Sequence, residues 1–383
     1  MTTMRRYCFD GRTAQAHFPG IGRYASSLVG AMAAQLDPDE QLLVLRDPTR
    51  PLLFTPFDSD NPALRYLDLP LSPFSLRQQW VVPSVLRRHR VTVYHSPYLL
   101  MPLFLPAPAV VTIHDFIPLR FPQESTLKAR WLFRLALYPA LRRAARVIAV
   151  SRSTAEDLRR YAPSQLSKSI VCLEAAGEHF KPASDPAVAE LKRRLSLPER
   201  YALYLGSNKP HKNLDRLIEA WQSLSLPVPL ILAGVRIPVY RVPAGVGAMT
   251  SEAPVRILGE CREQDLAVLY SGATLFVFPS LYEGFGLPVL EAMACGAPVA
   301  CSDRSSLPEV AGQAAVYFDP TSPQNMAQVL QNVLTDEWRI DAMRSASLLR
   351  AATFSWRKAA RETLSVYREL ARGLSSGTPK RKR

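Results

Sequence analysis

The sequence predicts an α/β protein of two domains, each with a parallel sheet covered by helices. Three observations support this. Short apolar runs alternate with segments at helical spacing along the 383 residues. Glycine-containing turns follow several of these runs, and the chain is long enough to form two separate cores. A hydrophobic content of 48% with 21% charged residues is typical of a globular protein.

The first half of the sequence is predicted to form one domain, over residues 1–180. Its apolar and aromatic runs predict strands, and helical segments separate them. A loop with Gly20 and Gly22 joins the first strand to the first helix, where glycine either lets the backbone approach a ligand or serves a simple turn. The predicted strands are 6–10, 41–45, 91–94, 109–113, 147–150 and 170–173, and the predicted helices are 25–36, 76–88, 124–146 and one capped by 151–154.

His114 and Asp115 directly follow the predicted strand 109–113. Polar residues at the carboxyl ends of strands in an open α/β sheet point toward the ligand crevice. A histidine at such a place is often only structural, and Asp115 either orients His114 or caps the next turn. His95, after the strand 91–94, is a weaker candidate for facing an acceptor molecule.

The helical segment 124–146 carries many basic and aromatic residues. A basic amphipathic helix with aromatics is typical of a membrane surface, but a core helix with a solvated cationic face has the same composition. Both interpretations stay open. The residues concerned are Lys128, Arg130, Arg134, Arg142, Arg143 and Arg146, interleaved with Trp131, Phe133, Leu135, Leu137 and Tyr138.

The second domain is predicted over residues 181–354, after a linker at 177–186. Residues 355–373 form a last helix that returns to the first domain in one interpretation, and 374–383 form a basic disordered tail. The predicted strands are 201–205, 230–234, 255–259, 273–278, 299–301 and 315–318, and the predicted helices are 187–195, 214–223, 260–266, 309–311 and 323–336.

A glycine turn follows the first strand of this second domain, in the stretch G-S-N-K-P-H-K-N from Gly206 to Asn213. Strand, glycine turn and helix again form a doubly wound unit. Lys212 can pair with a phosphate as a point charge, and the Ser207 hydroxyl can donate to one.

The stretch from Pro279 to Pro298 reads P-S-L-Y-E-G-F-G-L-P-V-L-E-A-M-A-C-G-A-P. It passes from a strand through a glycine loop into a helix, and Gly296 ends that helix. Free backbone amides at a helix start bind anions. Carboxylates flank this start at Glu283 and Glu291, which suits a sugar diphosphate whose hydroxyl groups lie on either side of the phosphates.

This stretch resembles the signature of the retaining nucleotide-sugar glycosyltransferases of family 4. The resemblance implies a GT-B fold, with two Rossmann-like domains facing across a cleft, the first for the acceptor and the second for the donor. It also implies roles for individual residues. His114 and Glu283 contact the donor sugar, and the donor is bound by Gly20, Gly22, Ser207, Lys209, Lys212, Leu258, Gly284, Phe285, Gly286, Leu287 and Glu291.

The 206–213 stretch departs from the family pattern in its cations. A basic residue is expected either after the glycine or just before the lysine, and Ser207 and His211 occupy those two positions. Either Lys209 supplies the missing positive charge, or the site lacks that charge. The combined motifs are most similar to mannosyl- or rhamnosyl-transferring enzymes of bacterial surface polysaccharides, with GDP-mannose before UDP-sugars as donor and a glycan or lipid-linked glycan as acceptor.

Charge and composition limit the classes of molecule that the protein is expected to bind. The net charge of +14 suits nucleic acid, anionic lipid or an anionic substrate, but no nucleic-acid-binding module is recognised. No transmembrane run, signal peptide or Cys-x-x-Cys pair is found, so a cytoplasmic protein is expected, either free or peripheral at the inner face of the membrane. The Asp58–Asp60 pair falls in a poorly defined loop, so no metal or cofactor is expected.

The predicted function is hexose transfer to an acceptor hydroxyl with retained configuration. Two alternatives remain. A nucleotide-sugar epimerase of the same fold would need further acid–base carboxylates on the first domain, which are not found. A binding protein without catalysis would suit an anionic polymer, although its motifs are intact.

Overall fold

The computed structural model describes residues 4–14, 19–50, 61–234, 246–249 and 252–376. It divides into two compact units. Unit 1 comprises residues 1–174 and 355–383, and unit 2 comprises residues 175–354. The boundary therefore lies after Glu174, compared with the predicted boundary after residue 180. Asp58, Asp60 and the basic residues after Ser376 lie outside the described residues.

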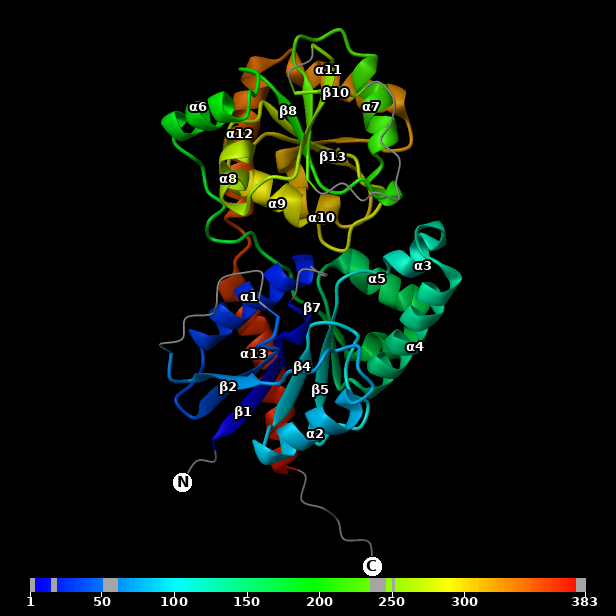
Figure 1. Cartoon of the computed structure of the whole chain (residues 1–383), viewed down its shortest axis with the longest axis vertical. Helices are drawn as coiled ribbons and strands as arrows, with labels where there is room; N and C mark the ends of the chain where they lie inside the picture. Colours follow the sequence, from blue (N-terminus) through cyan, green and yellow to red (C-terminus); the bar gives the residue numbers. More distant parts are fainter. Residues whose placement is uncertain (1–3, 15–18, 51–60, 235–245, 250–251, 377–383) are drawn as a thin grey trace, which may run out of the picture. The chain divides into compact units, whose positions relative to one another are not determined.

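Unit 1 is built on a parallel sheet that, in the described residues, has seven strands in the order β3-β2-β1-β4-β5-β6-β7 (Figure 1). The bounds are β1 Arg5–Asp10, β2 Glu40–Arg46, β3 Leu64–Asp68, β4 Val93–Ser96, β5 Ala109–Ile113, β6 Arg146–Ala149 and β7 Ser169–Val171. Its helices are α1 Pro19–Ala33, α2 Gln78–Arg88, α3 Ile117–Arg120, α4 Leu127–Arg143, α5 Arg152–Tyr161 and α13 Trp356–Ser376. Short 3₁₀ turns are η1 Gly11–Thr13, η2 Pro122–Glu124 and η3 Pro163–Lys168.

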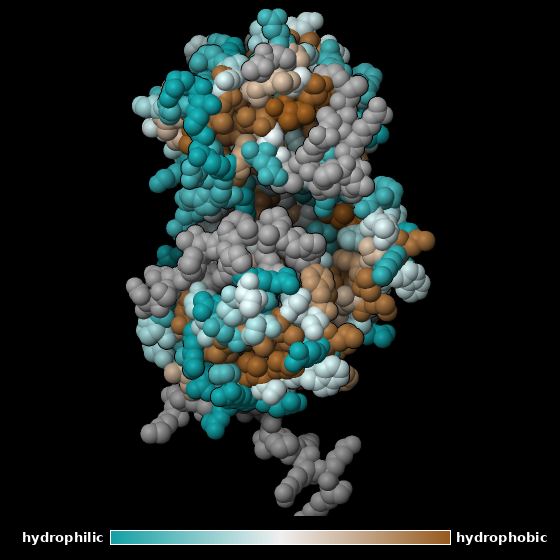
Figure 2. All heavy atoms as spheres, in the orientation of Figure 1, coloured by the Kyte–Doolittle hydropathy of each residue, from teal (hydrophilic) through white to brown (hydrophobic). Residues whose placement is uncertain are grey.

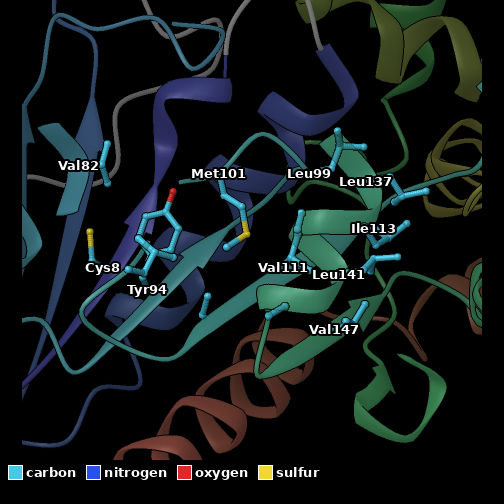
Figure 3. Close-up of a cluster of buried hydrophobic side chains, with 14 of the residues drawn as sticks. Cys8, Val82, Tyr94, Leu99, Met101, Val111, Ile113, Leu137, Leu141 and Val147 are labelled. Atoms are coloured by element: carbon cyan, nitrogen blue, oxygen red, sulfur yellow. The ribbon is translucent and has the colours of Figure 1, made fainter. Parts of the chain in front are cut away.

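The two faces of this sheet bury different residues because side chains alternate along each strand. Cys8, Tyr94 and Val111 belong to one face, where a cluster with residues of α2, α4 and α5 forms a core (Figure 3). Tyr7 and His95 belong to the other face, where both meet Tyr367 of α13. The last helix thus packs on the sheet of unit 1, although the chain has passed through unit 2 before it.

Ionic and hydrogen-bonded contacts fix α13 to the rest of unit 1. The Arg368 guanidinium donates to both carboxylate oxygens of Glu40, at 2.9 and 2.7 Å, and the Tyr7 hydroxyl donates to the same carboxylate at 2.7 Å. Burial of the carboxylate side chain without partners would be costly, so the cation and the hydroxyl stabilise it together.

Unit 2 has a second parallel sheet, with seven strands among its described residues in the order β10-β11-β9-β8-β12-β13-β14. The bounds are β8 Ala202–Leu205, β9 Leu230–Ala233, β10 Gly247–Ala248, β11 Val255–Gly259, β12 Leu275–Phe278, β13 Val299–Ser302 and β14 Ala315–Phe318. Its helices are α6 Asp185–Arg194, α7 Leu214–Gln222, α8 Glu263–Ser271, α9 Leu287–Ala294, α10 Leu307–Ala311, α11 Pro323–Leu334 and α12 Glu337–Ala351, with 3₁₀ turns η4 Pro210–Lys212 and η5 Gly312–Ala314.

Helices α6, α8, α9 and α12 pack next to one another, and α7 packs with α11. In the described residues, no helix is both long and apolar enough to cross a membrane.

Candidate active site

Lys212 and Glu283 meet at the point where the strand order of unit 2 reverses. From β8 the chain first builds outward through β9 and β11, and it then returns to add β12 on the other side of β8. Ligands of open α/β sheets bind outside the carboxyl ends of the strands at such a point. Lys212 ends the turn after β8 and Glu283 follows β12. Their Nζ and Oε1 atoms are 2.7 Å apart.

The surroundings hold this pair in place. The Lys212 ammonium lies 5.1 Å from the ring centroid of Phe278, at the end of β12. The neighbouring Asn213 adopts a left-handed backbone conformation with φ of 61°. Its side-chain nitrogen Nδ2 donates to the carbonyls of Pro279 and Pro320 at 3.1 and 2.7 Å. Asn213 thereby ties the loop after β8 to the loop after β12, so both charged side chains are carried on linked backbone.

Two serines that the sequence analysis missed hold the Glu283 backbone. The Ser305 hydroxyl donates to the Glu283 carbonyl at 2.5 Å and lies 3.2 Å from the Glu283 amide. The Ser306 hydroxyl donates to the same carbonyl at 3.0 Å. The sequence signal for them was a Ser-Ser pair just before α10, in a segment predicted only as a loop.

The start of α9 follows the same loop. Gly286 has φ of 106°, a conformation that favours glycine, and Pro288 lies in the first turn. The amides of Val289 and Leu290 already donate to the Gly286 carbonyl, at 3.0 and 3.3 Å. The predicted anion site therefore depends on the backbone before Val289, at Gly284 to Leu287.

The predicted role of Phe285 is limited by its packing. Its side chain is buried, and its ring meets the Phe354 ring edge-on at 6.1 Å. Only its backbone remains to face a ligand, while Leu287 and Gly284 are half-buried.

Glu291 lies inside α9 and is buried. Its Oε2 atom is 3.3 Å from the hydroxyl oxygen of Tyr270, on α8. Tyr270 was not predicted as part of the site, because no local pattern connects it to a residue on the next helix. A tyrosine donor next to the carboxylate fixes the direction in which that carboxylate can accept further hydrogen bonds.

The remaining predicted donor residues lie at neighbouring strand ends of unit 2. Ser207 is half-buried and its carbonyl accepts from the Tyr204 hydroxyl at 2.7 Å. Lys209 is exposed at the start of the turn that ends in Lys212. Leu258 is half-buried near the end of β11, where the Gly259 carbonyl accepts from the amide of Gly234, the residue that follows the neighbouring strand β9.

His114 of unit 1 has both ring nitrogens next to protein acceptors. Its Nε2 is 2.9 Å from the Pro97 carbonyl oxygen, and its Nδ1 is 3.2 Å from Oε1 of Glu174. The side chain is 14% exposed, so a ligand can reach part of it. Neither Glu174 nor Pro97 was singled out from the sequence.

The neighbours of His114 resolve two open questions. Asp115 caps the following turn, because its Oδ1 accepts from the Ile117 amide at 2.9 Å. The prediction that His95 faces an acceptor is wrong, because its ring is fully buried between Tyr367 and Thr112. This burial, together with the nearby His114, lowers the pKa of His95 to about 3.

The predicted glycine loop of unit 1 is also placed differently. Helix α1 begins at Pro19, so Gly20 and Gly22 lie in its first turn and not in a loop before it. Proline has the backbone torsion of a first helical turn and needs no hydrogen-bond acceptor there, which explains the earlier start. Residues 15–18 lie outside the described residues.

A small cavity opens next to His114 in unit 1. Its lining combines apolar side chains with the polar groups of Tyr98, Thr112, His114 and Asp115. The lining residues are Tyr98, Leu99, Thr112, Ile113, His114, Asp115, Pro118 and Phe133.

Known proteins match both units of the chain. Residues 189–348 match the model for glycosyl transferases group 1, and residues 19–171 match the model for glycosyltransferase family 4. The O-antigen chain mannosyltransferase B of Escherichia coli is 33% identical over 305 residues, which is 77% of each chain. The serotype-specific mannosyltransferase WbdA of Escherichia coli is 32% identical over 281 residues, covering 70% of this chain but 34% of WbdA.

Solved structures share the fold. The HepE protein of Anabaena, solved in complex with UDP and glucose, superposes with a TM-score of 0.71 at 17% identity, over 95% of this chain and 100% of HepE. This likeness confirms the predicted GT-B architecture. The match over 77% of the mannosyltransferase B sequence confirms the predicted family, and the chain therefore belongs to the family 4 glycosyltransferases, which are enzymes of the GT-B fold.

Proposed function

We propose that this enzyme transfers a mannosyl residue from a nucleotide sugar to a hydroxyl group of a bacterial surface polysaccharide or glycolipid, with retained anomeric configuration. GDP-mannose is the first candidate donor and UDP-sugars come next. The names of the two Escherichia coli relatives support mannose and an O-antigen acceptor. The HepE complex supports a nucleoside diphosphate donor for this fold.

The observation that carries the proposal is the Lys212–Glu283 pair at the switch point of unit 2. When the bond between the sugar and the diphosphate breaks, negative charge grows on the departing phosphate. A fixed ammonium group and backbone amides stabilise that charge, because they need not reorganise during the reaction. In this proposal Lys212 and the backbone at the start of α9 provide the charge stabilisation, so no metal ion is needed.

The carboxylates of Glu283 and Glu291 bind hydroxyl groups of the donor. Glu283 accepts from the sugar and Glu291 accepts from the ribose, each as a charge-assisted acceptor. The acceptor hydroxyl attacks the anomeric carbon from the face that the diphosphate leaves, and its proton passes to a departing phosphate oxygen. Attack and departure on one face retain the configuration without a protein nucleophile.

We further propose that unit 1 binds the acceptor and meets an anionic membrane through α4. The core face of this helix is apolar, as the buried Phe133 and Leu137 show, but its outward face also carries apolar side chains. Trp131 and Leu135 are each 63% exposed, and Lys128, Arg134 and Arg142 are exposed beside them. In Figure 2, hydrophobic and hydrophilic groups alternate on the flank of unit 1 over α4. A core helix with a purely cationic outer face would lack these exposed apolar groups.

The loop before β5 extends this surface. The Arg143 guanidinium donates to the Leu103 and Leu105 carbonyls, both at 2.8 Å, which places Phe104 beside the end of α4 with 79% of its area exposed. Large apolar side chains flanked by cations suit the boundary between anionic headgroups and acyl chains. A lipid-linked acceptor and a cytoplasmic location at the inner membrane face are the corresponding proposals.

The test of the donor and reaction is a screen of GDP-mannose, GDP-fucose, UDP-glucose and UDP-galactose with mannose-terminated oligosaccharide acceptors. The expected result is turnover with GDP-mannose and an α-linked product by NMR spectroscopy. Turnover of the donor without acceptor would indicate an epimerase, binding without turnover a non-catalytic protein, and a β-linked product an inverting reaction. Any of these three results would contradict the proposal.

A further inference from the structure

The imidazole of His114 is held between two hydrogen-bond acceptors. The Pro97 carbonyl lies next to Nε2, and a carbonyl can only accept a hydrogen bond. The Glu174 carboxylate lies next to Nδ1. A neutral imidazole carries one N–H and can satisfy only one acceptor. Both contacts act as hydrogen bonds only when a proton lies in each of them.

Glu174 is placed where an unpaired carboxylate would be costly. It is 4% exposed, and burying a carboxylate destabilises a protein strongly unless the group is paired and hydrogen-bonded. The partner it faces is His114, 60 residues earlier in the chain. The pairing therefore satisfies the carboxylate and at the same time fixes the rotation of the ring.

Other residues of unit 1 restrict the same histidine from further sides. The Tyr24 ring meets the His114 ring edge-on, with centroids 4.8 Å apart and planes at 87°. The Thr154 hydroxyl donates to the His114 carbonyl at 3.2 Å. Tyr24 is itself held at its hydroxyl, 3.0 Å from Oγ1 of Thr112. With contacts to both nitrogens, to the ring and to the backbone, the His114 side chain is held in one orientation.

Glu174 is also the last residue of unit 1 before the chain enters unit 2. The contact with His114 therefore connects the candidate catalytic histidine to the chain crossing between the units. Tyr24 adds a second such contact, because its ring lies 5.9 Å from that of Trp356, near the returning crossing.

We propose that Glu174 is a positioning residue for sugar transfer, which acts by holding the His114 ring against the Pro97 carbonyl. The proposal rests on the proposed function and on the role that the family resemblance implies for His114, contact with the donor sugar. Misplacement of a catalytic group by about 1 Å lowers a rate by roughly a hundredfold, so loss of the Glu174 contact should lower kcat and leave donor KM nearly unchanged.

The kinetic test compares three variants of the full-length enzyme with GDP-mannose, or with whichever sugar nucleotide the donor screen finds to turn over. Glu174→Ala should lower kcat about ten- to hundredfold, with KM changed less than about threefold. Glu174→Gln should restore kcat to within about threefold of wild type, because its amide can still donate to Nδ1 of a neutral ring. Glu178→Ala, at an exposed carboxylate four residues later, is the matched control and should behave as wild type.

A spectroscopic test does not depend on the donor. The chain has six histidines, and ¹⁵N-labelled histidine NMR with a His114→Gln variant identifies the His114 signal. In the wild type a proton should be found in the hydrogen bond between Nδ1 and Glu174 as well as in that of Nε2, whereas in Glu174→Ala only Nε2 should show one. Thermal unfolding of each variant shows whether the fold is kept.

The outcomes separate the two proposals. Wild-type kcat in Glu174→Ala, equal losses in the Ala and Gln variants, or a His114 signal unchanged in Glu174→Ala would overturn the positioning role. If His114→Ala keeps wild-type activity while the NMR signals show the pair, the proposed role of His114 fails and the contact is structural.

Discussion

The ammonium nitrogen of Lys212 lies 2.7 Å from the carboxylate of Glu283. These side chains come from turns after β8 and β12, 71 residues apart. In the proposed reaction Lys212 binds phosphate and Glu283 binds sugar hydroxyls, whereas in this structure the two side chains bind each other. A donor must replace this ion pair with contacts of its own, and only a ligand that offers both phosphate and hydroxyl groups can satisfy both side chains.

We expect Lys212→Ala to weaken nucleoside diphosphate binding about ten- to hundredfold, because charge-assisted hydrogen bonds contribute about 1.5–3 kcal/mol. The bare nucleoside should bind nearly as before. Calorimetry with GDP and guanosine measures both, with Lys181→Ala, at an exposed lysine of the same unit, as control. Equal losses for GDP and guanosine would mean that Lys212 does not contact phosphate.

Glu283→Gln should separate binding of the nucleotide from sugar transfer. Removing the carboxylate frees Lys212, so the affinity for GDP alone should stay the same or rise. Transfer from GDP-mannose should fall about ten- to hundredfold in kcat/KM, since the charged acceptor for the sugar is lost. A large loss of GDP affinity would contradict the competition between Glu283 and phosphate for Lys212.

Local patterns predicted the fold of both units because each strand, glycine turn and helix is contiguous in sequence. Strands β5, β11 and β14 have the predicted bounds. The long helix at 124–146 is shorter than predicted, since the Thr126 side chain caps α4 by accepting from the Ala129 amide and the chain is extended at Ala144 before β6. Strand β3 and helix α12 were not placed, the former because its flanks are rich in proline and polar residues.

The candidate site was only partly predictable, for a physical reason. Lys212 and Glu283 lie in recognisable loops, but their contact arises from the order of strands in the sheet, which sequence spacing does not show. The same holds for Glu174, which meets His114 across 60 residues, and for Ser305 and Tyr270. A polar residue whose partner is distant in sequence has no local pattern to identify it.

We expect Glu291→Gln to reduce the discrimination between GDP and its 2′,3′-dideoxy analogue. The wild-type carboxylate accepts from ribose hydroxyls in the proposed complex, and a neutral amide accepts more weakly, by about 1.5–3 kcal/mol at most. The affinity for GDP should fall while that for the dideoxy analogue stays near wild type. If both affinities fall alike, Glu291 supports α9 through Tyr270 and does not contact the ribose.

Arg368→Ala should destabilise unit 1, by an amount that depends on pH. Burial raises the pKa of the Glu40 carboxyl, but hydrogen bonds from Arg368, the Asp37 amide and Tyr7 outweigh it and hold this pKa below its usual value. Such a carboxylate stabilises the fold above its unfolded pKa, and the contribution disappears as the pH falls through the folded pKa. The variant should lose about 1.5–3 kcal/mol at neutral pH.

The difference between wild type and Arg368→Ala should shrink as the pH falls below the ordinary pKa of a glutamate and through the lowered pKa of folded Glu40. Urea unfolding at neutral and acidic pH measures it, and Arg361→Ala, at an exposed arginine of the same helix, is the control. A loss of stability that is constant with pH would show that Arg368 acts through packing alone.

Flotation with liposomes tests the membrane surface of unit 1. Each basic side chain near an anionic leaflet contributes about 1 kcal/mol, and exposed apolar groups add burial in the interface. The enzyme should float with phosphatidylglycerol vesicles at low salt and not with phosphatidylcholine vesicles. At 1 M salt, where the screening length falls to about 3 Å, binding should largely disappear.

Two sets of substitutions distinguish membrane binding through the α4 surface from binding that depends only on the net charge of +14. Replacing Lys128, Arg134 and Arg142 with Ser should abolish flotation, and Trp131→Ala should weaken it at unchanged net charge. Arg143 is kept, because it holds the 103–105 loop. The control replaces Arg87, Arg88 and Arg90, at exposed positions at and just after the end of α2, with Ser. It removes the same amount of charge and should leave membrane binding intact. Equal losses in both triple variants would mean that net charge, and not the α4 surface, attracts the membrane.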